Sequence, residues 1–353
     1  MGIEIDRDEN GIDQGEEGGD PPVRHEEKVG SGAEMNCPLC HATSQFAFRV
    51  SDVFYKFTDY EAELHKCTDC GVLFQVPLPD RNQAAQFYGS GYWQETKPSG
   101  LVSSLQRVYV RFLMRADLMG WVQRMRLKPQ ARVVDVGCSR GDWLLEMRAR
   151  GLETQGVEGD LRAVQHARDV HKLNVIHSDL EDWCPEPQSI DAITCFHVLE
   201  HLTDPKGFLL LCHQALRQPG VLLIRVPNID SWQGKWFKEG WKGLEPPRHL
   251  INFTPKALLG LLDECGFEIH RWSTWSWRDG PPAWSSSLLP TGEPTYQLVH
   301  GRKNTLKQLM YLGLTTLITP LERWAAILQK GGMITVLAEK RSEPGLENGG
   351  NPV

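Results

Sequence analysis

Four cysteines of this 353-residue chain stand in two CxxC pairs, a spacing typical of a zinc site. Cys37 and Cys40 form the first pair, and Cys67 and Cys70 form the second. Each pair can point both sulfurs at one ion, and two pairs complete a tetrahedral shell of four thiolates. Such a shell has no open position, so the expected zinc is structural. A redox dithiol and a structural disulfide pair are the alternatives.

A glycine-bearing turn after a β-branched run carries a second group of candidate residues. Asp135, Gly137, Ser139 and Gly141 occupy alternate positions of this turn. Glycine lets a ligand approach the backbone closely, and an acid ends the strand. The dinucleotide pattern GxGxxG is not met, because residues 139 and 142 are not glycine. A tight strand-to-helix turn without a ligand is the alternative.

Two acids follow the next two predicted strands. Glu158 stands 21 residues after Gly137, at a strand end where a carboxylate can accept both hydroxyls of a ribose. Asp179, followed by Leu180, is placed to accept a hydrogen bond from an adenine amino group. Together these acids indicate a nucleotide-like ligand.

His197, Glu200 and His201 match the inverted zinc-protease pattern HxxEH. That motif needs both histidines on one helix face around an open zinc. Here His197 ends a predicted strand, and Asp204-Pro205 ends the turn soon afterwards. This context disfavours a zinc-protease site and leaves a role in a ligand pocket open for His197 and His201. A bound metal ion and a purely structural turn are the alternatives.

Tryptophans gather in one segment of the chain, which could hold the acceptor, that is, the molecule on which a bound cofactor would act. Seven of the twelve lie within 53 residues, at positions 232, 236, 241, 272, 275, 277 and 284. Indole faces suit planar or sugar-like molecules, and neighbouring cations suit an anionic group. Trp236, Trp241 and Arg248 are the expected acceptor contacts, and packing of a long insertion against the sheet is the alternative.

The elements that must position these residues alternate between short β-branched runs and helical segments, which predicts an α/β sheet. A helix is expected at 101–126, and two helices broken near Pro320 are expected at 305–330. The apolar spacing of the second segment fits an amphipathic lid or a dimer surface more simply than a membrane anchor. The seven expected strands are 132–136, 154–157, 174–177, 191–196, 221–226, 267–272 and 334–338. Further strands are expected in the zinc module at 46–50 and 53–57.

The order of these motifs resembles that of class I S-adenosylmethionine-dependent methyltransferases. The resemblance rests on residues 133–141, Glu158, Asp179, 190–205 and 216–220, and covers about residues 130–228. It implies a Rossmann-like sheet of order 3-2-1-4-5-7-6, with the last strand antiparallel, and S-adenosylmethionine as cofactor. Ser139 stands where the family usually has glycine. The cofactor-binding residues that it implies are Asp135, Gly137, Ser139, Gly141, Glu158, Asp179, Leu180 and His197. It also implies that the segment 199–201 lies beside the cofactor and the mouth of the acceptor site, with His201 toward the acceptor.

A later segment, 245–254, resembles one found in methyltransferases that also carry an N-terminal four-cysteine zinc module, including sugar C-methyltransferases. In those proteins the histidine corresponding to His249 is placed to act as a base. The chemistry is suitable, because an imidazole of ordinary pKa, near 6.5, can accept a proton from a hydroxyl or an acidic C–H. A histidine that shapes the loop by bonding a carbonyl is the alternative.

Charge separates an acidic tail from a balanced body. Residues 1–33 hold 10 acids and 3 bases, which accounts for the whole net charge of −7. The remaining 35 acids and 35 bases provide no overall field toward nucleic acid or an anionic membrane, which leaves open a local basic patch. The start lacks a secretory signal, and the longest uncharged apolar stretch, 14 residues, is too short to span a bilayer, so we expect a cytoplasmic protein.

The expected organisation is a zinc-binding module at 34–95 and a methyltransferase domain at 96–341, with acceptor-side insertions at 229–254 and 278–331. The segments 1–33 and 342–353 are expected to be disordered tails. The predicted function is O- or C-methylation of a small molecule, such as a sugar, a polysaccharide precursor or a secondary metabolite. An RNA methyltransferase is one alternative, disfavoured by the neutral body. A binding protein that kept the fold without catalysis is another.

Overall fold

The computed structural model describes residues 35–88, 101–302 and 304–342. The tails expected at 1–33 and 342–353 lie outside the described residues, apart from residue 342 itself, as does the end of the predicted zinc module, 89–95. Within the described ranges, none of the helices has the length and apolar character needed to traverse a bilayer.

The main sheet has seven strands in the order β10-β11-β8-β7-β4-β5-β6. β11 is antiparallel to both of its neighbours, whereas the pairs from β8 to β6 are parallel. Numbered along the domain, this is the predicted order 3-2-1-4-5-7-6, and the prediction is confirmed. The strands are β4 (Arg132–Val136), β5 (Glu153–Glu158), β6 (Val175–His177), β7 (Ile190–Phe196), β8 (Leu216–Pro227), β10 (Phe267–Ser273) and β11 (Met333–Lys340).

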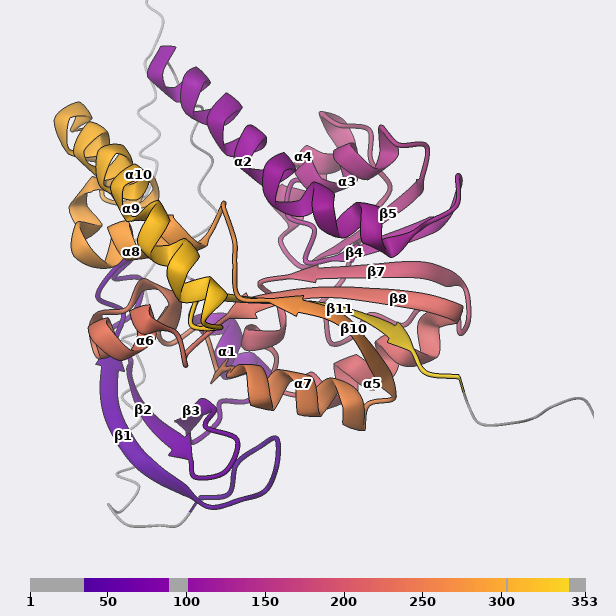
Figure 1. Cartoon of the computed structure of the whole chain (residues 1–353), viewed down its shortest axis with the longest axis horizontal. Helices are drawn as coiled ribbons and strands as arrows, with labels where there is room; N and C mark the ends of the chain where they lie inside the picture. Colours follow the sequence, from indigo (N-terminus) through magenta and orange to yellow (C-terminus); the bar gives the residue numbers. More distant parts are fainter. Residues whose placement is uncertain (1–34, 89–100, 303, 343–353) are drawn as a thin grey trace, which may run out of the picture. The chain divides into compact units, whose positions relative to one another are not determined.

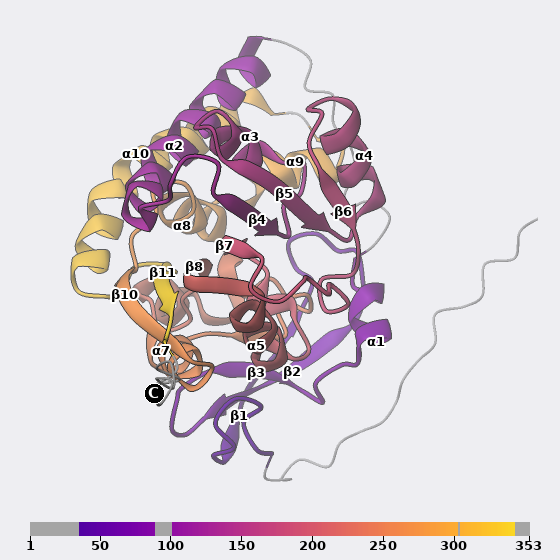
Figure 2. The same cartoon turned by 90° about the vertical axis from the view of Figure 1, so that its right-hand side faces the viewer.

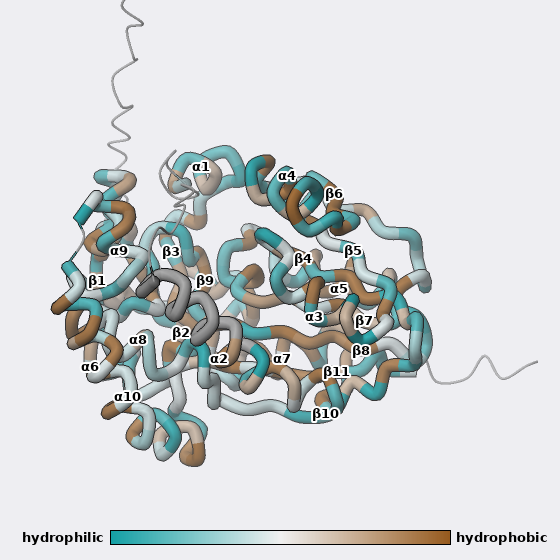
Figure 3. The backbone as a smooth tube through the Cα atoms, turned by 90° about the horizontal axis from the view of Figure 1, so that it is seen from above, coloured by the Kyte–Doolittle hydropathy of each residue, from teal (hydrophilic) through white to brown (hydrophobic). Residues whose placement is uncertain are grey.

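Helices cover both faces of this sheet (Figures 1 and 2). One face carries α2 (Leu101–Met125), α3 (Asp142–Arg148) and α4 (Leu161–Asp169). The other carries α5 (Pro205–Ala215) and α7 (Pro255–Glu264). Because both faces are covered, the central strands are almost continuously apolar, as the hydrophobic colouring of β8 in Figure 3 illustrates.

A second sheet, of order β1-β2-β3-β9, has Cys67 at the end of β2, and the other three cysteines of the zinc module lie in the turns beside it. β1 (Ser44–Ser51), β2 (Glu61–Cys67) and β3 (Leu73–Val76) come from the zinc module, and the short helix α1 (Arg81–Gln86) follows them. β9 (Ile251–Asn252) comes from the predicted acceptor-side insertion and pairs with β3. The module and the α/β domain therefore share a sheet.

The strand expected at 53–57 is wrong, because these residues form a turn. The Asp52 carboxylate accepts hydrogen bonds from the backbone N–H groups of Tyr55 (3.1 Å) and Phe57 (3.0 Å). An acid that bonds the backbone a few residues ahead favours a turn over a ladder. The two aromatic rings stack at 5.6 Å, which satisfies the apolar character of the segment without a strand.

The segment 278–331 adds α8 (Gly280–Leu288), α9 (Pro294–Val299) and α10 (Thr305–Ile327), and α6 (Trp232–Phe237) precedes it. The expectation of two helices broken at Pro320 is wrong, because α10 is continuous through it. A proline inside a helix costs about 3 kcal/mol. Buried side chains on both sides of the proline, Tyr311, Thr315, Glu322 and Ala325, hold α10 against the domain.

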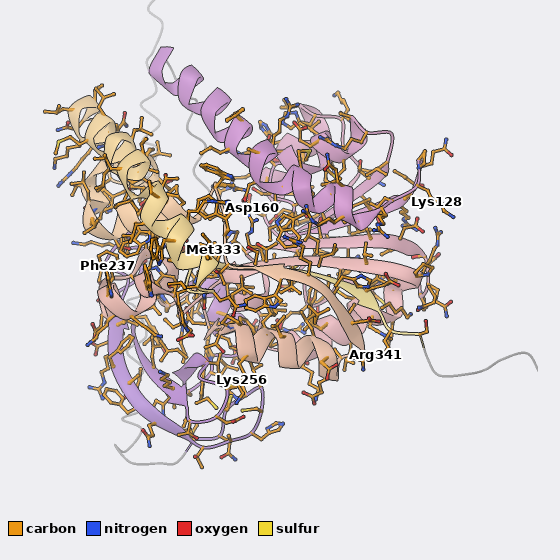
Figure 4. The ribbon with its side chains drawn as sticks, viewed as in Figure 1. Lys128, Asp160, Phe237, Lys256, Met333 and Arg341 are labelled. Carbon is orange, nitrogen blue, oxygen red and sulfur yellow. The ribbon has the colours of Figure 1, made fainter. Side chains whose placement is uncertain are left out.

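The ends of the strands define two opposite edges of the main sheet, one at the carboxyl ends of the parallel strands and one at their amino ends (Figure 4). Asp160, just after β5, and Met333, at the start of β11, mark the edge where the parallel strands end. Lys128, just before β4, and Arg341, just after β11, mark the opposite edge. In open α/β sheets, ligands bind beyond the carboxyl ends of the strands, so the first edge is the place to seek a site.

Candidate functional site

The turn after β4 has the left-handed backbone that its glycines allow. Gly137 has φ of +73° and Gly141 has φ of +82°. A Cβ added at Gly137 would overlap Cγ2 of Val198, and one added at Gly141 would overlap Cδ1 of Leu173. Ser139 adopts φ of +49°, which costs a non-glycine residue on the order of 1 kcal/mol. Ser139 thus adopts the left-handed backbone that glycine adopts more easily, which is consistent with the glycine usually found at this position in the family that the sequence resembles.

Asp135 lies buried at the end of β4, and its Oδ1 accepts a hydrogen bond of 2.6 Å from the Thr194 hydroxyl. The Thr194 oxygen in turn accepts from the Trp143 indole N–H at 3.1 Å. Burial raises the pKa of Asp135 to about 7, because the hydrogen bond from Thr194 only partly offsets desolvation and Glu158 adds negative charge. Near neutral pH, Asp135 is therefore poised between its two protonation states.

Glu158 ends β5 with its carboxylate turned back on the glycine turn. Its two oxygens accept backbone N–H bonds from Ser139 (2.7 Å) and Asp160 (2.9 Å). Burial raises the pKa of Glu158, and these N–H bonds oppose the rise. Each carboxylate oxygen has a further lone pair. The carboxylate can therefore accept a ligand hydroxyl while it holds the turn in place.

Asp179 and Leu180 follow β6. Asp179 is exposed, and its carboxylate accepts a backbone N–H bond of 3.0 Å from Glu181. Leu180 is half-buried, with its Cδ1 3.8 Å from where a Cβ on Gly137 would stand. Leu180 thus lies against the glycine turn, and the preceding residue, Asp179, is open to solvent.

His197 stands at the end of β7 in a left-handed conformation, φ +58°. Such strain in a non-glycine residue is typical of functional sites. Its Nδ1 lies 3.4 Å from Oε1 of Glu200, and its Nε2 lies 3.5 Å from Oδ2 of Asp279. Desolvation lowers the pKa of His197, but its ion pairs with these two carboxylates outweigh that and raise it to about 9. His197 is therefore an imidazolium at neutral pH.

Glu200 is completely buried, and neither of its carboxylate oxygens has a hydrogen-bond partner in the described part of the chain. Its pKa is nevertheless lowered, because His197, His249 and His201 together outweigh the desolvation that opposes ionisation. A buried, ionised carboxylate without hydrogen bonds is costly. Its surroundings must supply compensating positive charge, or a ligand must supply hydrogen bonds.

His249 is the third member of this cluster. Its Nδ1 hydrogen-bonds with the carbonyl of Gly243 at 2.9 Å, and its Nε2 lies 4.0 Å from Oε1 of Glu200. A carbonyl only accepts, so Nδ1 carries the proton and Nε2 keeps its lone pair. Burial, reinforced by the charge of His201, lowers the pKa of His249 to about 4. The side chain is a neutral imidazole with its basic nitrogen on the Glu200 side.

A buried group of charges behind His197 was not foreseen from the sequence. Arg225, near the carboxyl end of β8, forms ion pairs with Asp117 at 2.6 Å and Asp279 at 3.1 Å. The backbone N–H of His197 donates to the carbonyl of Arg225 at 2.9 Å. An arginine inside an otherwise apolar strand was the available signal, since such a residue must find an anionic partner.

His201 connects the turn after β7 to the zinc module. Its Nδ1 lies 2.8 Å from the Tyr88 hydroxyl and 3.0 Å from the carbonyl of Arg248. The rings of His201 and His249 are 4.6 Å apart, edge to face. The structure therefore brings together His197, His201 and His249 around Glu200.

Two of the expected acceptor contacts are occupied by other protein groups. Trp241 is 0% exposed, and its indole N–H donates to Gln233 at 3.2 Å. Arg248 is also buried and forms a double hydrogen bond with Asp52, at 2.9 and 3.0 Å. The expectation that these two side chains contact an acceptor therefore has no support in the geometry. Trp236, by contrast, is 64% exposed.

The four cysteines converge in the zinc module. Sγ atoms of Cys37 and Cys70 are 3.7 Å apart, and those of Cys40 and Cys67 are 3.4 Å apart. All four sulfurs lie within 4.8 Å of one another, and none forms a disulfide. Thiolates around a tetrahedral zinc, with Zn–S near 2.3 Å, stand about 3.8 Å apart.

Both cysteine turns have the same local design. Backbone N–H groups donate to sulfur, from Leu39 to Cys37 at 3.5 Å and from Asp69 to Cys67 at 3.4 Å. The residue after each second cysteine is left-handed, with φ of 59° at His41 and 73° at Gly71. The chemistry and the spacing of these sulfurs fit a zinc ion.

Among the described residues, one further group could hold a metal ion. Glu200, His201 and His249 each offer a ligand atom, and these atoms lie within 4.8 Å of one another. The same side chains could instead handle a proton, because they combine an imidazole lone pair with a buried negative charge.

Comparison with known proteins gives a family match for part of the chain. The family described as "Methyltransferase domain" matches residues 109–271. A ubiquinone biosynthesis O-methyltransferase of Idiomarina loihiensis is 28% identical over 136 residues, which cover 36% of this chain and 52% of that protein. A probable S-adenosylmethionine-dependent methyltransferase of Mycolicibacterium smegmatis is 28% identical over 141 residues, covering 39% of this chain and 52% of that protein. The chain thus spans about half the length of these curated relatives.

Solved structures also resemble the chain. The crystal structure of a SAM dependent methyltransferase from Archaeoglobus fulgidus has 22% sequence identity and a TM-score of 0.45, covering 65% of this chain and 94% of that chain. The family match and the observed strand order together establish that this chain carries a class I S-adenosylmethionine-dependent methyltransferase domain.

Proposed function

We propose that the protein methylates a small molecule at a nucleophilic oxygen or carbon, with S-adenosylmethionine as donor and His249 as the base. The observation that carries this proposal is the neutral His249, whose basic nitrogen faces the buried carboxylate of Glu200. The name of the Idiomarina loihiensis relative supports a small-molecule acceptor with a hydroxyl group.

The residues that would hold the donor fit its chemistry. The glycine turn exposes backbone rather than side chains, and the Glu158 carboxylate keeps lone pairs for ribose hydroxyls. Asp135, Leu180 and the open Asp179 complete the set that we assign to the donor. When bound, the donor supplies a methyl group on a positively charged sulfur, already activated for transfer.

The chain's own task is to align the acceptor, exclude water and remove one proton. The Gly243 carbonyl fixes the tautomer of His249, so that Nε2 is the atom that accepts the acceptor's proton. In the folded protein, the pKa of His249 is about 4, which keeps this nitrogen unprotonated at neutral pH. Nε2 is therefore free to accept a proton, but as a weaker base than an ordinary imidazole, so the imidazolium that forms needs a stabilising group.

Glu200 is proposed to stabilise the imidazolium that forms on His249 during the reaction. In its resting state the carboxylate is compensated by His197 at 3.4 Å. Protonation of His249, at 4.0 Å, places a second positive charge beside it. A buried carboxylate next to a catalytic histidine has this stabilising role in the serine hydrolases as well.

The position of the cluster supports its assignment to the methyl-transfer site. Val198, between His197 and Glu200, packs so closely against the glycine turn that a Cβ on Gly137 would overlap it. The Leu250 N–H donates to the Glu200 carbonyl at 2.8 Å, which links the turn to the His249 segment. The turn 199–201 thus lies between the proposed donor site and the proposed base.

We also propose that Cys37, Cys40, Cys67 and Cys70 hold a structural zinc. The sulfur spacings and the paired N–H···S turns support this assignment. With four protein ligands the ion would have no open position, so its role would be to hold the module together.

Mass spectrometry of metabolite extracts, incubated with methyl-labelled S-adenosylmethionine, tests the proposal. The wild-type protein should label a small molecule. His249→Gln should lower turnover by about 10²- to 10⁴-fold, the usual contribution of a general base, with donor affinity nearly unchanged. His270→Gln, a change to an exposed histidine on β10, is the matched control.

Two results would count against the roles assigned here. Full turnover in His249→Gln would remove it as the base. A strict requirement for added Mg²⁺ or Mn²⁺ would instead assign Glu200, His201 and His249 to a metal ion.

A further inference from the structure

One face of α10 is apolar, regular and open to solvent. Seven outward positions follow one another at alternating steps of four and three residues, and all are exposed. This spacing keeps side chains on one side of a helix. The largest exposed fractions are those of Leu317 (79%), Ile327 (74%), Leu306 (68%), Trp324 (64%) and Met310 (55%). We call the set the α10 face; it comprises Leu306, Met310, Gly313, Leu317, Pro320, Trp324 and Ile327.

The opposite side of α10 is firmly attached to the domain. Glu322 is 0% exposed and accepts hydrogen bonds from the Trp284 indole (2.7 Å) and the backbone of Gly332 (2.7 Å). The Thr315 hydroxyl bonds Ser285 of α8 at 2.9 Å. Because these buried contacts fix the rotation of the helix, the apolar face cannot turn inward. Figure 3 shows hydrophobic residues recurring along this helix.

The charge around the α10 face is positive. Between residues 304 and 330 the only acid is Glu322, and it is buried. Arg323 is exposed and lies 5.4 Å from the ring of Trp275, and Lys307 is half-exposed near the start of the helix. Lys330 forms an ion pair with Asp230 and adds nothing to the balance. An apolar strip with unopposed cations is complementary to an apolar layer with anionic groups.

We propose that the α10 face lies flat on an anionic lipid surface. An interfacial helix combines leucines and tryptophan on its apolar side with flanking lysine or arginine. α10 meets this description with Leu306, Leu317 and Trp324 and with Lys307 and Arg323. As no helix of the described residues could cross a bilayer, the helix would lie in the interface plane.

A second copy of the chain fits this face less well. Two such faces would bring Lys307 and Arg323 of one copy near the same cations of the other. Gly313 and Pro320 also occupy two of the seam positions, where a coiled coil needs large apolar knobs. The proposal therefore differs from the lid or dimer surface that the sequence analysis expected for this segment.

This placement goes beyond the proposed methylation reaction. The C-terminal end of α10 joins the edge of the sheet that carries the candidate site, since the Asn228 amide donates to the Gly331 carbonyl at 2.8 Å. Docking of α10 would therefore hold the acceptor side of the domain close to the lipid surface.

Vesicle flotation with the full chain tests the proposal. Vesicles of phosphatidylcholine with roughly 30% of the anionic lipid phosphatidylglycerol should carry the protein, whereas vesicles of pure phosphatidylcholine should bind it much less. Leu317→Glu should reduce the bound fraction by at least about tenfold, because it places a charge in the apolar layer. Val170→Glu, at another exposed apolar residue, just after α4 (61% exposed, against 79% for Leu317), is the matched control and should bind normally.

The results distinguish a lipid surface from a second copy of the chain as the partner of the α10 face. Equal loss in both variants, or no binding to anionic vesicles by the wild type, would overturn the proposal. A wild-type dimer in sedimentation analysis that Leu317→Glu converts to a monomer would assign the face to a second copy. Circular dichroism of each variant shows that a loss of binding is not a loss of folding.

Discussion

The buried ion pair between Arg248 and Asp52 should make the zinc module and the methyltransferase domain unfold together. Their side chains are 0% and 1% exposed and share two hydrogen bonds, of 2.9 and 3.0 Å. Removing one partner of a buried pair leaves an unpaired charge, which costs about 3–5 kcal/mol. Arg248→Met should therefore lower the free energy of unfolding by about that amount.

The surface pair between Arg49 and Glu63 provides the matched control. The arginine side chain is 58% exposed, and the closest N···O distance is 3.1 Å. Exposed pairs contribute about 0–1 kcal/mol, so Arg49→Met should change stability by no more than that. The double variant Arg248→Met with Asp52→Asn should cost less than the sum of the two single changes, because each single change leaves a charge without its partner.

Urea unfolding, followed by tryptophan fluorescence and by far-ultraviolet circular dichroism, measures these effects. A single transition, shifted strongly by Arg248→Met and only weakly by Arg49→Met, is expected. If Arg248→Met were within about 1 kcal/mol of Arg49→Met, the pair would be no better than a surface contact and the reasoning would fail. Two separate transitions in the wild type would refute the coupling of the two parts.

Three further predictions address the individual sites. Burial raises the pKa of Asp135 from 3.8 to about 7, so the free energy of unfolding of the protein without donor should fall as pH rises between those values. Asp135→Asn should remove this pH dependence. In thermal melts at pH 8 it should stabilise the protein by at most about 4 kcal/mol. Glu158→Gln should weaken donor binding in calorimetry, because an amide cannot accept from both ribose hydroxyls and both backbone N–H groups. Cys37→Ser should lower the zinc content measured by atomic absorption and reduce the melting temperature, whereas Cys184→Ser, at an exposed cysteine outside the cluster, should do neither.

The sheet could be read from the sequence because its strands carry strong local patterns. β4 was expected at 132–136 and is observed there, and β7 was expected at 191–196 and begins one residue earlier. The turn around Gly137 was also readable, since two closely spaced glycines after a buried strand favour a left-handed turn. The four cysteines needed no more than their spacing.

Contacts between distant segments could not be read in the same way. Arg248 and Asp52 are separated by 196 positions, and nothing near either residue indicates the other. β9 has two residues and owes its strand conformation to β3, not to its own composition. Trp241 looked like an acceptor contact because indole suits both roles, and only the fold shows that Gln233 holds it in the core.

The site around Glu200 shows the same limit. The HxxEH pattern identified His197, Glu200 and His201, but their neighbours Asp279 and His249 come from other parts of the chain. Asp279 and Glu200 set the pKa of His197 above its ordinary value, whereas burial sets that of His249 below it. The protonation state that suits His249 to act as a base is therefore a product of the fold.

Isothermal titration calorimetry of the full chain with S-adenosylmethionine tests the central claim most directly. The account predicts saturable binding of one donor molecule per chain, with affinity reduced in Glu158→Gln and retained in His249→Gln. An absence of binding by the wild-type protein under conditions where it is folded would contradict the account and leave the domain as a scaffold without its donor.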